Sequence, residues 1–305
     1  MFFFKQAALA AGLIALIAFS GAVRAQEVEI QNDVEFAKHD GVALQADLYM
    51  PKAPGKYPAL VAVFGGGWQV GSRKTYRYWG PYLAARGYVV MAVTYRLMKP
   101  GQKTYPEAVH DVRAAVQWIK GRGEAIKVDP TRVGLMGDSA GGHLAALVGI
   151  AGDAPAFAGA YRDDPYAGVS TKAKVVIGAY GVYDMVAQWN HDQLARPRDQ
   201  IVEKFLGVPP MENRRLYFDA SPMSYAVTAN NATSFLLTYG TEDDIVDRKS
   251  QSDAFLAALK QARFFARNAV IQGYGHFWFT DPIEEPGSAP GQLAPRLLRF
   301  LADRL

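Results

Sequence analysis

Short apolar runs recur along the chain after residue 50, and most are bounded by glycine, proline or charged residues. They occupy residues 57–64, 88–94, 133–136, 175–179, 235–239 and 269–271. Uninterrupted apolar runs of this length are typical of strands that are buried on both faces, as in a parallel sheet. Residues 34–50, ahead of these runs, predict two further short strands that are joined by a turn at residues 39–41.

Amphipathic stretches between the apolar runs predict helices. Two apolar stripes have helical spacing, one formed by Val109, Val112, Val116 and Ile119 and one by Leu297, Leu298, Leu301 and Leu305. Strands that alternate with helices predict an α/β fold, in which helices cover both faces of a parallel sheet. Residues 183–228 fit this alternation poorly because they are rich in Asp, Arg, Pro and aromatic residues. We expect them to form an insertion over the C-terminal edge of the sheet.

The first 25 residues have the pattern of a secretory signal peptide. Lys5 precedes an apolar run at residues 7–19, which is shorter than the roughly 20 residues that a membrane-spanning helix needs. Val23 and Ala25 place small residues at the positions expected before a cleavage site. We therefore expect a mature, single-domain chain of residues 26–305 that is periplasmic or secreted and has no stable membrane anchor. An uncleaved N-terminal anchor is the alternative.

The composition excludes several kinds of site. The sequence contains no cysteine, so disulfides, thiolate nucleophiles and cysteine–metal sites are ruled out. Removal of Lys5 and Arg24 with the signal peptide lowers the formal net charge from +4 to about +2. Because this charge is small and no dense Lys or Arg run is present, we expect no nucleic-acid partner. The sequence does not indicate an oligomeric state.

The most informative motif is Gly-Asp-Ser-Ala-Gly-Gly at residues 137–142. An apolar run precedes it, and small and apolar residues with helical character follow it. In this context Gly-x-Ser-x-Gly is typical of a sharp strand-to-helix turn, in which glycines avoid backbone collisions and expose the serine. The N-terminus of the following helix directs N–H groups toward the place where an oxyanion would form. Ser139 is therefore the candidate nucleophile of a hydrolase.

A serine nucleophile needs a base, and in folds with this turn an acid and then a histidine follow the serine along the chain. His276 follows the last apolar run in a glycine-rich segment, which can bring its imidazole above the edge of the sheet. It is the candidate base. Four histidines are less suitable because they precede Ser139, lie on the helix after it or lie in the insertion: His39, His110, His143 and His191. The acid is expected among residues 242–244, which are all acidic.

In these motifs the chain resembles esterases of the α/β-hydrolase family. Their signatures are His-Gly-Gly-Gly-Trp and Gly-x-Ser-Ala-Gly-Gly, and they include feruloyl-esterase-like and hormone-sensitive-lipase-like members. The resemblance covers about residues 57–279 and includes a Gly-Gly-Gly-Trp segment at residues 65–68. It implies the α/β-hydrolase fold and an oxyanion hole that is formed by the N–H groups of Gly66, Gly67 and Ala140.

The resemblance also selects the acid and reveals one departure. The family pattern Gly-x-x-Asp, followed by an apolar pair, selects Asp243. A triad of Ser139, Asp243 and His276 requires neither a metal nor an organic cofactor. The departure is Phe64, which stands where the family usually has a histidine. A phenyl ring cannot form a hydrogen bond that braces the glycine loop.

These features predict a serine hydrolase that cleaves small-molecule carboxylic esters, with short-chain or aryl groups, through an acyl-enzyme. Trp68, beside the oxyanion loop, and Trp278, beside the base, are candidates for an aromatic substrate pocket. Packing in the core is the alternative for each of them. The sequence leaves two other functions open. One is an amidase, peptidase or arylformamidase with the same triad, and the other is a catalytically inactive binding protein.

Overall fold

The computed structural model describes residues 26–305, so the predicted signal peptide lies outside the described residues. These residues form one eight-stranded sheet with the order β1-β2-β4-β3-β5-β6-β7-β8. β2 pairs antiparallel with β1 and with β4, and all other neighbouring strands are parallel. The strands are β1 (Val28–His39), β2 (Val42–Pro51), β3 (Tyr57–Val63), β4 (Val89–Val93), β5 (Val128–Asp138), β6 (Val175–Ala179), β7 (Ser234–Gly240) and β8 (Ala266–Ile271). The mostly parallel sheet that the apolar runs predict is confirmed.

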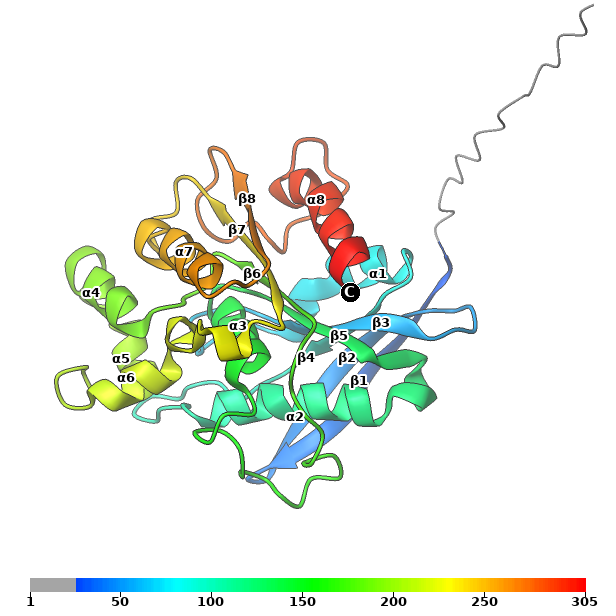
Figure 1. The fold of residues 1–305 in the computed structure, drawn as a ribbon, viewed down its shortest axis with the longest axis horizontal. Coiled ribbons are helices and arrows are strands. Elements are labelled where there is room, and N and C mark those ends of the chain that lie inside the picture. Colours follow the sequence, from blue (N-terminus) through cyan, green and yellow to red (C-terminus); the bar gives the residue numbers. More distant parts are fainter. Residues whose placement is uncertain (1–25) are drawn as a thin grey trace, which may run out of the picture.

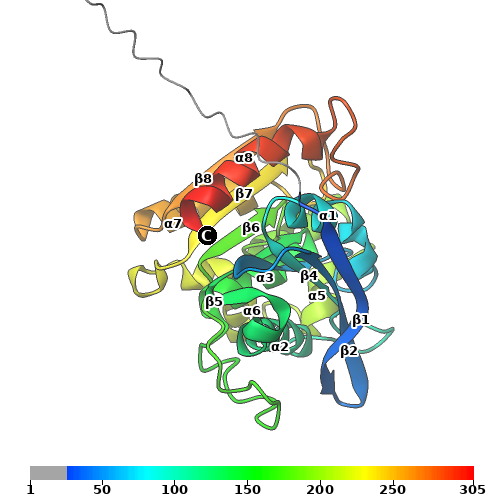
Figure 2. The ribbon, with the colours of Figure 1, turned by 90° about the vertical axis from the view of Figure 1, so that its right-hand side faces the viewer.

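Helices cover both faces of the sheet. They are α1 (Trp79–Ala84), α2 (Glu107–Gly121), α3 (Ala140–Ala151), α4 (Met185–Ala195), α5 (Ile201–Leu206), α6 (Arg214–Ala220), α7 (Ala254–Gln261) and α8 (Ala289–Arg304). α1 and α8 lie on one side of the sheet, and α2 and α3 lie on the other (Figures 1 and 2). From residue 26 onward, none of the helices is both long and apolar enough to span a membrane.

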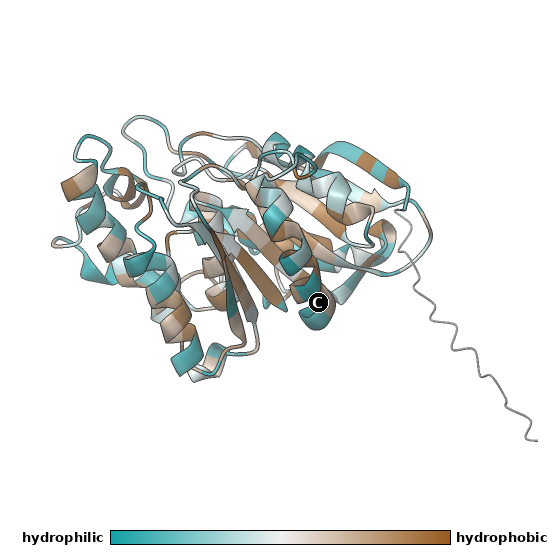
Figure 3. Ribbon diagram, turned by 90° about the horizontal axis from the view of Figure 1, so that it is seen from above, coloured by the Kyte–Doolittle hydropathy of each residue, from teal (hydrophilic) through white to brown (hydrophobic). Residues whose placement is uncertain are grey.

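The central strands are apolar because helices cover them on both faces. Every residue of β4, β6 and β7 is buried, and Figure 3 shows the hydrophobic colour concentrated in the sheet. Full burial of a Val, Leu or Ile side chain contributes roughly 1.5–3 kcal/mol each, so this core stabilises the scaffold from which the loops extend.

The strands at the two edges of the sheet are longer than the apolar pattern predicts. β1 begins at Val28, whereas the pattern places its first residue at 34, and β8 begins at Ala266, three residues before the apolar run. Much of β1 is exposed, and Arg267 and Asn268 of β8 are also exposed. An edge strand with one face in water carries polar residues there, so its ends are not visible as an apolar run.

The predicted insertion at residues 183–228 contains α4, α5 and α6. These three helices lie together at one end of the molecule (Figure 1). Residues of α4 and α5 line a cavity that also contains Ser139, so the insertion covers the C-terminal edge of the sheet as expected.

Candidate active site

Ser139 lies on a sharp turn between β5 and α3, where its backbone is held in a strained conformation. Its φ of 51° and ψ of −121° are unfavourable for a residue with a side chain. A Cβ at Gly137 would lie 2.3 Å from the carbonyl oxygen of Gly141, and a Cβ at Gly141 would lie 2.0 Å from that of Val63. The glycines of the motif are therefore required by close backbone contacts, and the turn leaves the serine at the end of β5.

Two loops bring a histidine and a carboxylate to Ser139. His276, after β8, has its Nε2 2.9 Å from the Ser139 Oγ and its Nδ1 2.7 Å from the Asp243 Oδ2. The side chains of His276 and Asp243 are both only 1% exposed, so the hydrogen bond between them is shielded from water. The Tyr180 ring packs against the imidazole with 4.3 Å between the ring centres. No motif in the sequence indicates this contact.

The three acidic residues in the loop after β7 differ in their contacts. The Oδ1 of Asp243 accepts hydrogen bonds from the N–H groups of Ile245, at 3.0 Å, and Val246, at 2.9 Å. These bonds orient the carboxylate so that its Oδ2 meets the imidazole. Glu242 and Asp244 are exposed and do not reach it. The structure thus brings together the three residues that the sequence selects as a triad.

The three residues predicted to form the oxyanion hole line the same cavity as Ser139. Gly66 and Gly67, in the loop after β3, have φ values of 116° and 59°, and a Cβ at Gly66 would lie 2.1 Å from the carbonyl oxygen of Val70. Ala140 is the first residue of α3. Within residues 26–305, the N–H groups of these two glycines and Ala140 donate no hydrogen bond. All three residues line the cavity that contains Ser139, where uncommitted donors can stabilise an oxyanion.

The start of the glycine loop is braced without a histidine. The Phe64 ring stacks on Tyr95 with 4.6 Å between the ring centres, and the Tyr95 hydroxyl donates to the Phe64 carbonyl at 3.0 Å. The Tyr76 hydroxyl donates to the Val63 carbonyl at 3.0 Å and lies 3.1 Å from the Asp138 carboxylate. Burial raises the pKa of Asp138 to about 6. Two tyrosines therefore fix the loop head where the resembling esterases usually have histidine.

Trp68, at the end of the glycine loop, has a φ of 58° and is held from three directions. Its Nε1 donates to the His143 Nδ1 at 3.1 Å, and the His143 Nε2 donates to the Ala220 carbonyl at 2.8 Å. The hydrogen bond that the Nδ1 accepts requires a neutral imidazole, and burial lowers the pKa of His143 to about 4. The indole also stacks on Phe205 of α5 with 4.4 Å between the ring centres. The backbone N–H of Met98 donates to the backbone carbonyl of Trp68. Trp68 lines the cavity, but these contacts chiefly fix the loop.

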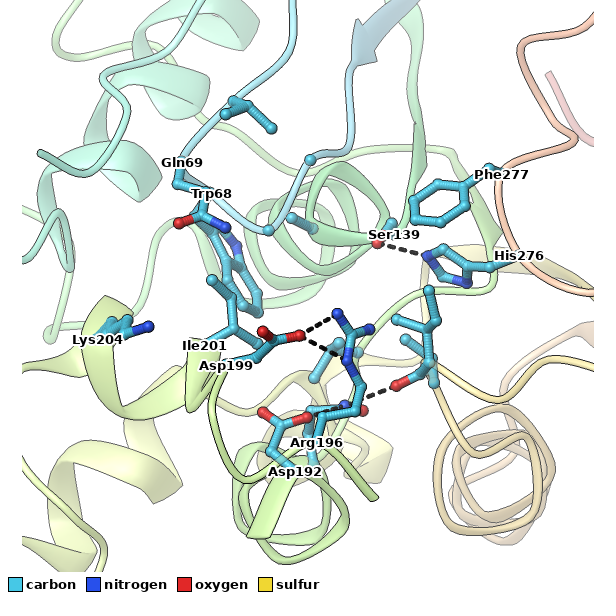
Figure 4. Close-up of a pocket in the computed structure, with 18 residues that line it drawn as sticks. Trp68, Gln69, Ser139, Asp192, Arg196, Asp199, Ile201, Lys204, His276 and Phe277 are labelled. Atoms are coloured by element: carbon cyan, nitrogen blue, oxygen red, sulfur yellow. Dashed lines mark hydrogen bonds and ion pairs between the residues drawn. The ribbon is translucent and has the colours of Figure 1, made fainter. Parts of the chain in front are cut away.

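A cavity of about 290 Å³ lies over Ser139 and His276 (Figure 4). Most of its wall is apolar and contains Val70, Val182, Ile201, Ile245, Val246 and Phe277. A polar part comes from the insertion and contains Gln188, Asp192, Arg196, Asp199 and Lys204. The sequence analysis does not identify these polar residues, because no motif marks them. The only available signal is the unusual charge of the insertion.

The wall beside His276 is formed by Phe277, and Trp278 does not line the cavity, contrary to the prediction for that residue. Phe277 has a φ of 68° and is 65% exposed, whereas Trp278 is 2% exposed. Trp278 packs against Tyr180 and Phe279. The turn of the backbone at Phe277 directs the two neighbouring rings to opposite sides, so Trp278 becomes part of the core.

Besides His143, three histidines lie outside this cavity. His39 is fully buried, with its Nδ1 2.7 Å from Asp111 and its Nε2 2.9 Å from Asp164. Burial lowers the pKa of His110 to about 4, and the His191 Nε2 donates to a backbone carbonyl. In the part of the chain that the structure describes, no group of three or more His, Asp or Glu side chains is arranged to hold a metal ion.

Comparisons with known proteins find similarity to esterases. The model of the BD-FAE family matches residues 46–259. A probable carboxylic ester hydrolase of Mycobacterium tuberculosis, LipM, is 27% identical over 68% of this chain and 46% of its own length. An ethyl acetate hydrolase of Pseudomonas putida is 29% identical over 83% of this chain and 77% of its own.

Among solved structures, the esterase Est2 of Thermogutta terrifontis is similar, with a TM-score of 0.71 and 25% identity over 92% of this chain and 93% of that chain. This similarity confirms the predicted α/β-hydrolase fold. The chain spans about half the length of the first curated relatives that it matches.

Proposed function

Because the chain belongs to the BD-FAE family and has the fold of the α/β-hydrolase esterases, we propose that it hydrolyses carboxylic esters through an acyl-enzyme. The observation that carries this proposal is the pair of hydrogen bonds that link His276 with Ser139 and with Asp243. A hydroxyl that donates to a neutral imidazole, oriented by a carboxylate, is the arrangement that activates serine.

The proposed reaction assigns a role to each group. The Nε2 of His276 accepts the proton of Ser139 as its Oγ attacks the ester carbonyl, and Asp243 stabilises the resulting imidazolium. The N–H groups of Gly66, Gly67 and Ala140 stabilise the oxyanion, and each such donor contributes about 3–4 kcal/mol to the transition state. The same proton then passes to the departing alcohol. Water, deprotonated by the imidazole, finally attacks the acyl-enzyme, and the imidazolium returns this proton to the Ser139 Oγ as the carboxylic acid leaves.

For the substrate, we propose short-chain or aryl esters. A cavity of about 290 Å³ with a mainly apolar wall supports this size. Structures of Est2, the neighbour from Thermogutta terrifontis, hold propionate or butyrate. For p-nitrophenyl esters from acetate to palmitate, we expect kcat/KM to be highest at about two to six acyl carbons. A maximum at palmitate, or a rate increase above the solubility limit, would refute this size.

A labelling experiment tests the proposed nucleophile and reaction class. Est2 has been solved as a paraoxon adduct, so we expect paraoxon to inactivate the wild-type protein and to label Ser139, as mapped by peptide mass spectrometry. Rates for ester and amide substrates of the same acyl group then separate an esterase from an amidase. Labelling at another residue, or faster amide cleavage, would overturn the assignment. Absence of both labelling and turnover would favour a binding protein.

We also propose that the protein acts in the periplasm or outside the cell after residues 1–25 are removed. The proposal rests on the short apolar run and the small residues at Val23 and Ala25. N-terminal sequencing of protein from the periplasm or medium should begin at Gln26. Protein retained in the membrane with Met1 intact would indicate an anchor instead.

A further inference from the structure

An ion pair from the insertion lies in the wall of the catalytic cavity. Arg196 follows the last residue of α4, and Asp199 lies in the turn that leads to α5. Figure 4 shows the Arg196 guanidinium directed toward the side of the cavity that contains Ser139 and His276, with the Asp199 carboxylate next to it. The side chains of the pair are 35% and 44% exposed, so a molecule in the cavity can reach both.

The ion pair leaves hydrogen-bonding capacity on both partners. The Nε of Arg196 donates to the Asp199 Oδ2 at 2.7 Å, and its Nη2 donates to the same oxygen. Within residues 26–305, neither the Nη1 of Arg196 nor the Oδ1 of Asp199 has a hydrogen-bond partner. The cavity wall therefore presents a free donor, the Arg196 Nη1, close to a free acceptor, the Asp199 Oδ1.

Arg196 and Asp199 are accessible polar groups in a mainly apolar wall, together with the exposed Gln69 and Lys204. Apolar residues from several separate segments form most of the cavity wall, and pockets of this kind use a few polar groups to orient a ligand. Two other polar residues of the insertion, Gln188 and Asp192, are buried, and the Gln188 amide donates to the Asp192 carboxylate. They are thus less accessible than Arg196 and Asp199.

We propose that Arg196 and Asp199 form a subsite that binds a hydroxyl group of the ester substrate, a specificity that rests on the proposed esterase function. A hydroxyl donates to the Asp199 Oδ1 and accepts from the Arg196 Nη1, so it uses both free positions. A substrate carboxylate would compete with Asp199 for the guanidinium, and an ammonium would compete with Arg196 for the carboxylate. The charged side chains that line the cavity are Arg196, Lys204, Asp192 and Asp199. Because Asp192 is buried, a ligand meets Arg196, Asp199 and Lys204, and a hydroxyl is favoured by the two free positions of the ion pair.

Isosteric esters test this subsite and show which part of the substrate it binds. 2-Hydroxyethyl butyrate and propyl butyrate differ at the alcohol, whereas ethyl 6-hydroxyhexanoate and ethyl heptanoate differ at the acyl end. For at least one pair, we expect the wild-type kcat/KM to favour the hydroxylated ester by about fivefold to tenfold, as one added hydrogen bond allows. In Arg196→Ala this ratio should fall close to one, and in Asp199→Asn it should decrease.

A matched ion pair elsewhere provides the control. Arg248 and Asp253 are exposed to similar extents, 35% and 38%, and do not line the cavity. Arg248→Ala should leave the selectivity ratio as in the wild type. Ratios near one for both wild-type ester pairs, or a ratio that Arg196→Ala does not change, would overturn the subsite but not the esterase proposal. No hydrolysis of any of the four esters would overturn both.

Discussion

Two histidines in this protein have almost the same hydrogen-bond geometry at different places in the fold. His276 places its Nδ1 2.7 Å from a carboxylate and its Nε2 2.9 Å from the hydroxyl of Ser139. His39, at the end of β1, places its Nδ1 2.7 Å from Asp111 and its Nε2 2.9 Å from Asp164. A short His–Asp hydrogen bond is therefore not by itself a sign of catalysis.

The partner of Nε2 determines what each histidine can do. Two carboxylates each need an N–H donor, so His39 must carry a proton on both nitrogens and has no lone pair to accept another. Burial lowers the pKa of His39, but its hydrogen bonds to Asp111 and Asp164 outweigh this effect and leave the pKa raised. The imidazolium also stacks on Tyr161 with 3.6 Å between the ring centres. At His276 the second partner is a hydroxyl, which can donate to a neutral ring.

The strongest test of this comparison replaces each of the two histidines with asparagine and measures activity and stability. His276→Asn should lower kcat on a short-chain p-nitrophenyl ester by about 10⁴-fold, because the serine loses its base. His39→Asn should leave kcat within about twofold but reduce the free energy of unfolding by about 1.5–3 kcal/mol, since the buried Asp111 loses a charged hydrogen-bond donor and keeps Arg96. Steady-state kinetics and urea unfolding of both variants measure this. A large loss of kcat with undiminished stability in His39→Asn would contradict the comparison.

Substitutions of the neighbouring residues Asp243 and Asp244 should differ just as clearly in their effect on kcat. Asp243→Asn should lower kcat by about 10³–10⁴-fold, because the amide favours the wrong tautomer of His276. Its neighbour Asp244 is exposed, so Asp244→Asn should change kcat by less than about twofold. Kinetic measurements on the two variants, with circular dichroism as the folding check, decide the assignment. Equal losses would reassign the acid.

A smaller effect on kcat is expected when the hydrogen bond between Trp68 and His143, which braces the oxyanion loop, is removed. Trp68→Phe removes the donor to His143 and keeps an aromatic ring against Phe205, so the oxyanion loop loses one anchor. We expect kcat to fall by about tenfold with little change in KM, because the loop acts on the transition state. Trp118→Phe on α2 truncates another buried indole and serves as the control. A change in KM alone would make Trp68 a substrate contact instead.

The smallest effect is the part of the pH dependence of stability that His39 produces. Its pKa is raised in the folded state, so its contribution to stability is complete below the unfolded pKa of about 6.5 and is lost as the pH rises through the folded pKa. The free energy of unfolding should therefore decline on the alkaline side of neutrality, and this decline should be weaker in His39→Gln. Urea unfolding at several pH values compares the slopes. Identical slopes would show that His39 is neutral when folded.

The sequence predicts the parts of the site that local backbone geometry defines. Ser139 and His276 are identified because a glycine turn and chain order mark them, whereas Asp243 needs a family pattern to separate it from its acidic neighbours. The cluster at His39 leaves no trace in the sequence, since Asp111 and Asp164 lie 72 and 125 residues away along the chain.

Two other features depend on backbone geometry that composition does not reveal. The positive φ at Phe277 reverses which ring enters the cavity, so Trp278 is misplaced by sequence proximity alone. The insertion has no single hydrophobic period, because its helices are short and bury only parts of their surfaces. Its contribution to the cavity wall, including Arg196, follows only from the folded structure.

The stacking of Trp68 on Phe205 limits how freely segments of this scaffold can be exchanged with those of related proteins. The triad residues lie on loops that follow strands of the sheet. Phe205 lies on α5 in the insertion, a segment that could be replaced by the insertion of a related protein. A chimera that receives a foreign insertion would lose an aromatic support of its oxyanion loop along with the old substrate wall. Donor segments for redesign should therefore be chosen first for an aromatic residue that meets Trp68, and only then for the specificity that they carry.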